Sequence, residues 1–96
     1  MAKSSTGVGD RFPLGQTVAT ANALKHLTHD DILGCLKRHA AGDWGDVDEH
    51  DRLANERALG DGSRLLSVYY AHNGTKFWII TEADRSSTCV LLPADY

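Results

Sequence analysis

The chain has few cysteines and no long apolar run, the features on which disulfide-stabilised and membrane-spanning proteins depend. Its two cysteines, Cys35 and Cys89, lie far apart in apolar contexts and form no Cys-x-x-Cys pair. This excludes a disulfide framework and predicts two buried, reduced thiols. No apolar run approaches the roughly 18 residues that a membrane-spanning helix needs, and the first residues lack the apolar core of a signal peptide. We therefore expect a cytoplasmic protein that makes no contact with a membrane.

An excess of positive charge is also absent. Ten Lys and Arg residues stand against thirteen Asp and Glu residues, which gives a formal net charge of −3. General binding of DNA or of anionic membranes depends on neutralising phosphates with Lys and Arg. We therefore expect no direct contact with nucleic acid.

The composition is that of an ordinary folded domain. Hydrophobic residues make up 42% of the chain and charged residues 24%, which excludes disorder throughout. The length suits one domain. We expect residues 1–12 to form a flexible tail and residues 13–96 to form a single domain.

The first half of that domain reads as helical. Thr20 is placed to cap a short helix over 21–27, and Thr28 a longer one that ends near Gly42. Apolar positions at helical spacing support the longer helix; they are Ile32, Cys35, Leu36, His39 and Ala40. A third helix is predicted from about 47 to 59, with Asp46 as its N-cap and Glu49 completing a capping box.

The second half reads as strands. Residues 64–71, 76–81 and 88–92 are rich in strand formers, and Asn73-Gly74 is a strong hairpin signal between the first two. The sequence therefore predicts an α+β fold, a three-stranded antiparallel β-meander packed against two to three N-terminal helices. Trp78 is expected to pack under a helix. Residues 16–20 are compatible with a short strand or with the start of a helix.

An acidic segment is the most unusual feature of the sequence. Five carboxylates and no Lys or Arg fall between residues 43 and 51, so the rest of the chain is slightly basic. One interpretation is a helix start, where the helix dipole and capping stabilise carboxylates. The other is a docking surface for a basic protein, with Trp44 either anchoring the loop in the core or forming an exposed contact. The candidate partner-binding residues are Asp43, Trp44, Asp46, Asp48, Glu49 and Asp51.

A second group of polar residues lies at the predicted turn between the last two strands. One interpretation is a hydrogen-bonded turn in which Arg85 pairs with a neighbouring carboxylate. The alternative is a site for an anion, a nucleotide or a protein loop, held by the guanidinium and the hydroxyls. The candidate residues are Glu82, Asp84, Arg85, Ser86 and Thr88.

Motifs that carry catalysis or metal binding are missing from the sequence. It contains no His-Glu-x-x-His, zinc-finger or EF-hand spacing and no Gly-x-Ser-x-Gly element. We therefore predict no metal site, no cofactor and no catalytic residue. A small hydrolase or nuclease that uses His39 with Asp43 is the least favoured alternative.

Several segments resemble a family of small bacterial proteins carried on plasmids, phages and other mobile elements, described as plasmid-related proteins. They are residues 39–46, 64–69, 78–86 and 90–96, of which 78–86 is the most specific. The resemblance covers about residues 14–96. It implies no catalytic residues, because the family has no established activity. It implies a context in which small acidic proteins often bind host proteins, including restriction and CRISPR defences.

Together these observations predict a non-enzymatic protein-binding module of a mobile element. Its expected partner is a host protein or complex, such as a nucleic-acid-handling defence system that it inhibits through its acidic surface. The alternative is a small-ligand or nucleotide binder. A homodimer is also possible, because an exposed sheet edge often pairs across a two-fold axis.

Overall fold

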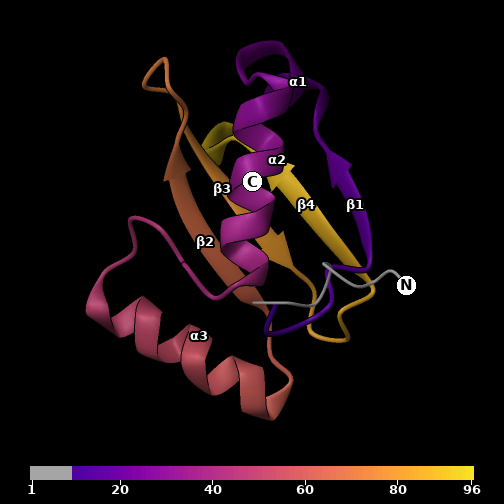
Figure 1. The fold of residues 1–96 in the computed structure, drawn as a ribbon, viewed down its shortest axis with the longest axis vertical. Coiled ribbons are helices and arrows are strands. Elements are labelled where there is room, and N and C mark those ends of the chain that lie inside the picture. Colours follow the sequence, from indigo (N-terminus) through magenta and orange to yellow (C-terminus); the bar gives the residue numbers. More distant parts are fainter. Residues whose placement is uncertain (1–9) are drawn as a thin grey trace.

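A computed structural model describes residues 10–96 and shows an α+β fold with three α-helices and a four-stranded mixed sheet (Figure 1). The helices are α1 (Ala21–His26), α2 (His29–Ala40) and α3 (Glu49–Asp61), and a 3₁₀ turn, η1 (Pro93–Asp95), follows the last strand. The strands are β1 (Gln16–Ala19), β2 (Leu65–Tyr70), β3 (Lys76–Thr81) and β4 (Ser87–Leu91). Their order in the sheet is β1-β4-β3-β2.

The predicted antiparallel meander forms three of the four strands. The hairpin of β2 and β3 pairs Val68 with Trp78, and β3 pairs Ile79 with Val90 of β4. The prediction of only three strands is wrong, because β1 adds to β4 in parallel. This strand has only four residues, and its partner lies about seventy residues away along the chain. No local turn signal therefore indicates the pairing.

The predicted α2 is confirmed. Thr28 caps it, accepting a hydrogen bond from the backbone N–H of Asp31, whose carboxylate accepts one from the Thr28 N–H in return. This capping box fixes the first turn. The apolar stripe faces inward, and four of its five residues are buried, including Cys35 and Leu36.

The start of α3 differs from the prediction. Asp48, not Asp46, is the N-cap, and its carboxylate accepts a hydrogen bond from the Asp51 N–H. Both aspartates precede an acidic first turn, so the sequence alone does not separate them. The helix extends to Asp61, beyond the predicted end near residue 59, and Gly62 follows it in a left-handed conformation.

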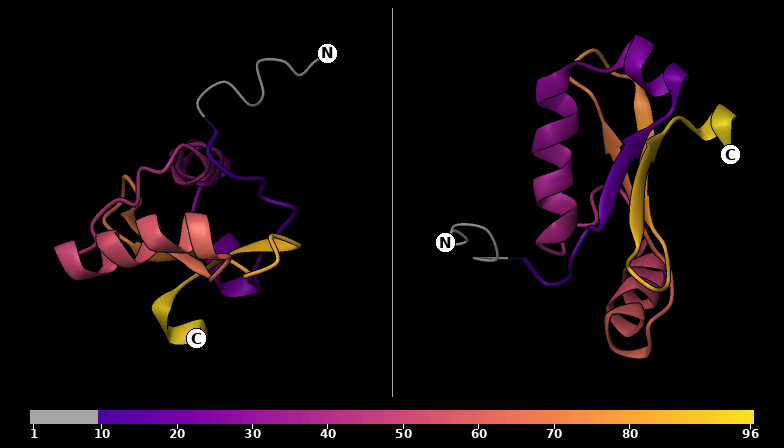
Figure 2. Two further views of the ribbon diagram at one scale, coloured as in Figure 1. Left: turned by 90° about the horizontal axis from the view of Figure 1, so that it is seen from below. Right: turned by 90° about the vertical axis from the view of Figure 1, so that its right-hand side faces the viewer.

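The sheet carries α2 on one face, and α3 flanks the outer edge of β2 (Figure 2). The main core lies between α2 and the sheet. Its largest fully buried side chains, Tyr69, Phe77 and Ile79, come from β2 and β3. A smaller apolar cluster joins Phe12 and Trp44 to Ala58 of α3 and Leu65 of β2.

Trp78 lies on the opposite face of the sheet, so the expectation that it packs under a helix is wrong. It neighbours Ile79 and Phe77 along β3, which point into the core beneath α2, and adjacent strand residues point to opposite faces. Its indole meets the Tyr96 ring edge-on, with centroids 5.6 Å apart. The C-terminal segment thus partly covers the second face (Figure 2).

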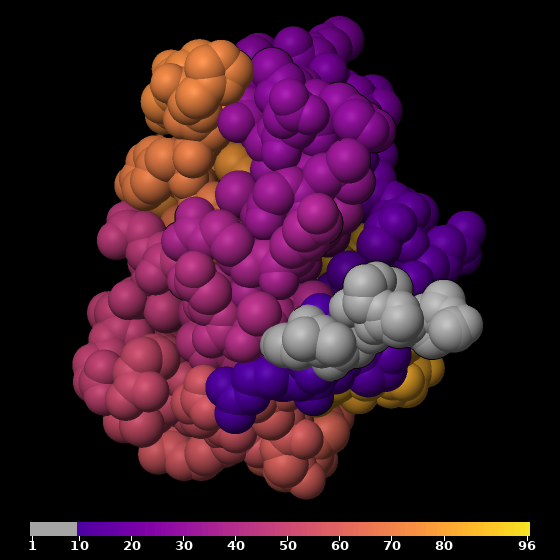
Figure 3. Space-filling model, viewed as in Figure 1, coloured from indigo at the N-terminus to yellow at the C-terminus, as the bar shows by residue number. Residues whose placement is uncertain are grey.

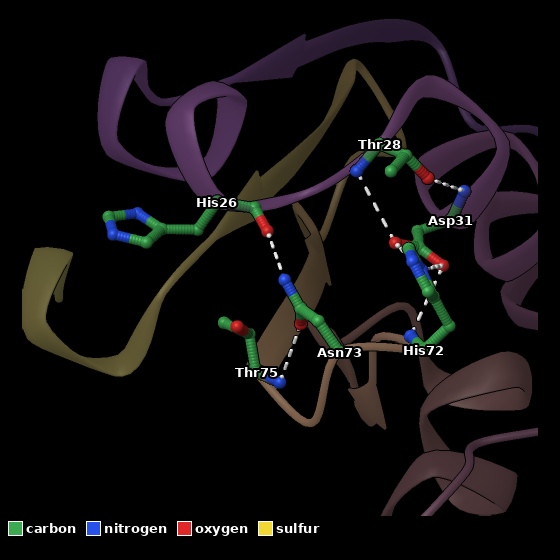
Figure 4. Close-up of polar contacts among 6 residues, drawn as sticks. All are labelled: His26, Thr28, Asp31, His72, Asn73 and Thr75. Carbon is green, nitrogen blue, oxygen red and sulfur yellow. Dashed lines mark hydrogen bonds and ion pairs between the residues drawn. The ribbon is translucent and has the colours of Figure 1, made fainter.

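The tip of the β2–β3 hairpin is fastened to the junction of α1 and α2 (Figure 4). The Asn73 side-chain amide donates to the carbonyl oxygen of His26 at 3.1 Å. The Asp31 carboxylate, which also takes part in the capping box of α2, lies 3.1 Å from Nδ1 of the His72 imidazole. The hairpin is thereby held over one end of the helical layer.

The first nine residues of the predicted tail lie outside the described residues. Arg11 and Phe12, which the prediction also assigned to the tail, pack against the domain. The Arg11 guanidinium forms two hydrogen bonds with the Glu56 carboxylate of α3, and Phe12 is 8% exposed. Part of the smaller core therefore comes from residues before position 13.

Two glycines with similar backbone conformations provide a test of the loop beside β2. Gly45 and Gly62 have φ angles of 74° and 77°. Alanine at either position would therefore be strained by roughly 1 kcal/mol, because an L-residue disfavours the left-handed region. A Cβ at Gly62 would meet no atom within 4 Å, whereas one at Gly45 would collide with the Val68 carbonyl oxygen.

We expect Gly45→Ala to lower the free energy of unfolding by about 2 kcal/mol more than Gly62→Ala, because the collision adds an overpacking cost. Urea denaturation followed by circular dichroism measures both. Equal losses in the two variants would contradict the close packing of the loop against β2.

Candidate functional site

The acidic segment is largely engaged in local contacts. Asp43 forms a two-pronged ion pair with Arg38 of α2, at 2.8 and 3.3 Å. The hydrogen bond from Arg38 lowers the pKa of Asp43, against a smaller opposing effect of burial. Asp48 caps α3, and Glu49 pairs with Arg52 one turn later. These contacts account for three of the five carboxylates as elements of loop and helix structure.

The two remaining acidic residues of the segment are Asp46 and Asp51. Both are exposed. The Asp46 backbone N–H donates to the Val68 carbonyl oxygen at 2.7 Å, so its position is fixed while its carboxylate faces solvent. These two groups are what the segment leaves available to a partner.

Trp44 anchors its loop in the core. It is 4% exposed, its ring stacks on Phe12 and meets His39 edge-on, and its indole N–H donates to Glu56 at 2.9 Å. Of the two roles predicted for Trp44, the structure confirms the one in which this side chain anchors its loop in the core. Trp44 is therefore not available at the surface as a contact residue.

The turn between β3 and β4 holds Arg85 in a structural position. Its guanidinium donates to the backbone carbonyl oxygens of Ala58, Ser63, Glu82 and Ala83, at 2.6–3.1 Å. It does not pair with the carboxylate of Glu82 or Asp84, as the first interpretation of the turn had expected. The bond to Ala58, whose carbonyl oxygen also accepts from the Gly62 N–H, joins the end of α3 to this turn.

The other residues of the predicted turn site are dispersed. The Asp84 carboxylate accepts a hydrogen bond from the backbone N–H of Ser86. Thr88 is fully buried and belongs to β4. The structure therefore does not gather Arg85, Ser86 and Thr88 around one open space.

A buried chain of hydrogen bonds through His39 joins side chains that lie far apart in the sequence. The His39 ring contacts the Ser67 hydroxyl through Nδ1 at 2.5 Å and the Thr81 hydroxyl through Nε2 at 2.9 Å. Thr81 contacts Thr88 at 2.7 Å, and Thr88 donates to the Leu14 carbonyl oxygen at 2.7 Å. The chain joins α2 to three strands and to the segment before β1.

The last acceptor sets the direction of the protons from Thr88 back to His39. A carbonyl oxygen only accepts, so Thr88 uses its proton on Leu14 and accepts from Thr81. Thr81 then accepts from Nε2–H of His39. In a neutral ring the one proton therefore lies on Nε2, and Nδ1 accepts from Ser67.

The surroundings of His39 support the neutral form. The ring is fully buried. Burial, together with the positive charge of Arg85, lowers its pKa from 6.5 to about 4.

Enclosure separates His39 and Ser67 from any substrate. Their contact is the one that a nucleophile and its base make in hydrolases, but neither side chain is exposed. Asp43, the predicted catalytic partner of His39, is bonded to Arg38 instead. The His39–Asp43 pair that the hydrolase alternative requires is not formed.

The two edges of the sheet differ in how their backbone groups are satisfied. On β2, the Asn55 side-chain amide bonds both the N–H and the carbonyl oxygen of Leu66. Val68 donates to the Trp44 carbonyl oxygen and accepts from the Asp46 N–H. The outward-facing groups of β2 are thus closed by α3 and its preceding loop, except at the strand's last residue.

The β1 edge is open. The N–H groups of Gln16 and Thr20 donate to the carbonyl oxygens of Ser86, just before β4, and of Val90 in β4. Alternation along a parallel strand therefore turns the N–H groups of Thr17 and Ala19 outward. Among residues 10–96 these outward-facing groups have no hydrogen-bond partner. The strand carries no charge or proline, the devices that usually protect an edge.

An apolar hollow of about 200 Å³ lies beside this open edge, between β1, α1 and α2. The face on which it lies is shown in Figure 3, where the β1 segment (indigo) borders α2 (magenta). Val18, Leu24 and Leu33 line it. They are three of the six exposed large hydrophobic residues in the described part of the chain. An unpaired strand and an apolar surface therefore occur side by side.

Within residues 10–96, no group of three or more His, Cys, Asp or Glu side chains is placed to hold a metal ion. The same residues contain no helix with the length and apolar character needed to cross a bilayer. Both free cysteines have a pKa raised by burial, which disfavours the reactive thiolate.

The neutral His39 makes stability depend on pH in a defined range. The unfolded chain binds a proton at this residue below about pH 6.5, and the folded chain does so only near pH 4. Stability must therefore fall as the pH drops through this range. The lowered pKa corresponds to about 3 kcal/mol at 1.36 kcal/mol per pH unit.

We expect the free energy of unfolding to decrease by about 2 kcal/mol between pH 6.5 and 5, above the range in which the carboxylates titrate. His39→Gln keeps a donor and an acceptor but cannot titrate, so this dependence should disappear, whereas exposed His50→Gln should retain it. Urea denaturation at several pH values measures the effect. A dependence that survives His39→Gln would show that another group titrates.

Comparison of the chain with models of protein families, with curated proteins and with solved structures finds no match. The resemblance to plasmid-related proteins therefore stays a prediction.

Proposed function

We propose that this chain is a non-enzymatic protein-binding module that pairs its open β1 edge with an extended segment of a partner protein. The observation that carries the proposal is the unsatisfied edge beside an apolar hollow. Addition of a strand to an exposed edge is a common mode of peptide recognition, in which backbone bonds give affinity and side-chain pockets give specificity.

The backbone groups of β1 specify the form of the partner. Thr17 and Ala19 each present one N–H and one carbonyl oxygen, so a paired strand gains up to four hydrogen bonds. Its side chains on the α2 side enter the hollow beside Leu24, which is 61% exposed, and Leu33, which is 45% exposed. The partner segment should therefore be extended and carry bulky apolar residues at alternate positions.

A second copy of this chain is a poorer occupant of the same edge. Two-fold pairing of β1 with itself about Val18 would place Thr17 opposite Ala19 of the other copy. These small side chains would face the two hollows and leave Leu24 and Leu33 uncovered. The apolar surface is better filled by larger side chains from a different segment.

The other predicted surfaces receive less support from the geometry. Local contacts engage three of the five carboxylates in the acidic segment, which leaves Asp46 and Asp51 for an added contact. Arg85 already donates to four carbonyl oxygens, which weakens the small-ligand alternative at its turn. A host defence protein as the partner is supported by the resemblance alone.

The test uses peptides selected from a random 12-residue display library against the purified chain. We expect selected peptides to share alternating bulky apolar residues. Leu33→Glu should weaken their binding by about tenfold or more, because a bound peptide would bury the new carboxylate. Leu53→Glu on α3 is the matched control, since Leu53 is 40% exposed on another surface, and it should bind like the wild type.

A backbone variant tests the hydrogen bonds themselves. Thr17→Pro removes an outward N–H that β4 does not use, a position at which an edge strand tolerates proline. It should abolish peptide binding while leaving the far-ultraviolet circular dichroism unchanged. The proposal is wrong if the selected peptides bind Leu33→Glu and Thr17→Pro normally. It is equally wrong if no peptide is selected, or if light scattering shows a dimer that Thr17→Pro dissociates.

A further inference from the structure

A second hollow lies on the face of the sheet opposite α2. It has a volume of about 290 Å³, near the lower end of the range for small-molecule pockets. Leu66 of β2 and Trp78 and Ile80 of β3 form its floor, while Arg64 and Tyr96 complete its lining. It is distant from the β1 edge, since β2 and β1 are the two outer strands.

Arg64 places a positive charge at the rim of this apolar hollow. Its guanidinium donates to the Tyr96 hydroxyl at 3.2 Å and lies 5.8 Å from the centre of the Tyr96 ring. It forms no ion pair with a carboxylate among the described residues, unlike Arg11, Arg38 and Arg52. Glu82 acts on it only through space. A guanidinium beside an apolar floor suits a ligand that ends in a carboxylate.

Trp78 adds an unsatisfied hydrogen-bond donor to the same place. Its indole N–H is buried without a partner, the only such side-chain atom in the described chain. Burying a donor without an acceptor costs roughly 1–3 kcal/mol. Tyr96, which packs edge-on against this indole, is 71% exposed at the end of the described chain. The unsatisfied donor therefore belongs to a side chain that lines the hollow together with Tyr96.

We propose that this hollow binds a small monocarboxylate with an apolar body about the size of one aromatic ring. The apolar part packs on Leu66, Trp78 and Ile80, and the carboxylate pairs with Arg64. Charge complementarity selects this class over an uncharged molecule of the same shape. The site is independent of the β1 edge, so the failure of one proposal leaves the other standing.

The test compares 3-phenylpropionate with 3-phenyl-1-propanol, which has the same body without the charge. Two-dimensional ¹H–¹⁵N NMR follows both tryptophan indole signals during titration. The Trp78 signal should move, whereas that of Trp44, which is bonded to Glu56 in the other cluster, should not. The carboxylate should bind at least about tenfold more tightly than the alcohol, as one charge-assisted hydrogen-bonded pair allows.

Arginine variants locate the charge. Arg64→Gln should reduce the affinity for 3-phenylpropionate to that for the alcohol, and Arg64→Lys should restore part of it. Arg57→Gln, an exposed arginine on α3, should bind like the wild type, and an unchanged Trp44 signal reports that each variant is folded. Equal affinity for acid and alcohol, normal binding by Arg64→Gln, or no movement of the Trp78 signal would overturn the proposal.

Discussion

The buried imidazole of His39 is the interaction on which the rest of this fold depends. It is the one strongly polar group of α2 that enters the core, and its two nitrogens meet hydroxyls on β2 and β3. A buried polar group must find partners or pay the cost of desolvation. In this placement both nitrogens have partners, which ties α2 to β2 and β3. The chain continues to Leu14 and sets the path of the segment that leads into β1.

The two edges of the sheet differ in how they are covered. His39 bonds α2 to Ser67 of β2 and Thr81 of β3, and the apolar hollow lies between α2, α1 and β1. On the other side, Asn55 and the Trp44 loop satisfy the outward groups of β2. One edge is therefore sealed by a helix and a loop, and the other remains open next to apolar side chains.

Sequence patterns predicted the parts of the fold that depend on local interactions. The α2 helix follows from its cap at Thr28 and its apolar stripe, and the β2–β3 hairpin from Asn73-Gly74. The pairing of β1 with β4 and the hydrogen-bond partners of His39 could not be predicted, because each depends on residues distant in sequence. The candidate sites failed for a related reason. The density of negative charge between residues 43 and 51 indicated a docking surface. In the structure, Asp43 forms an ion pair with Arg38, and Asp48 caps the start of α3. No sequence pattern indicates that the Arg85 guanidinium donates hydrogen bonds to four backbone carbonyl oxygens.

The central claim is that β1 is an open edge and β2 a closed one. Amide hydrogen exchange of the free protein, read by NMR, tests it without any substitution, at four outward-facing N–H groups. Leu66 and Val68 should exchange at least about tenfold more slowly, after correction for intrinsic rates, than Thr17 and Ala19, because only the former are hydrogen-bonded. Equal protection at all four positions, or stronger protection at Thr17 and Ala19, would contradict the account.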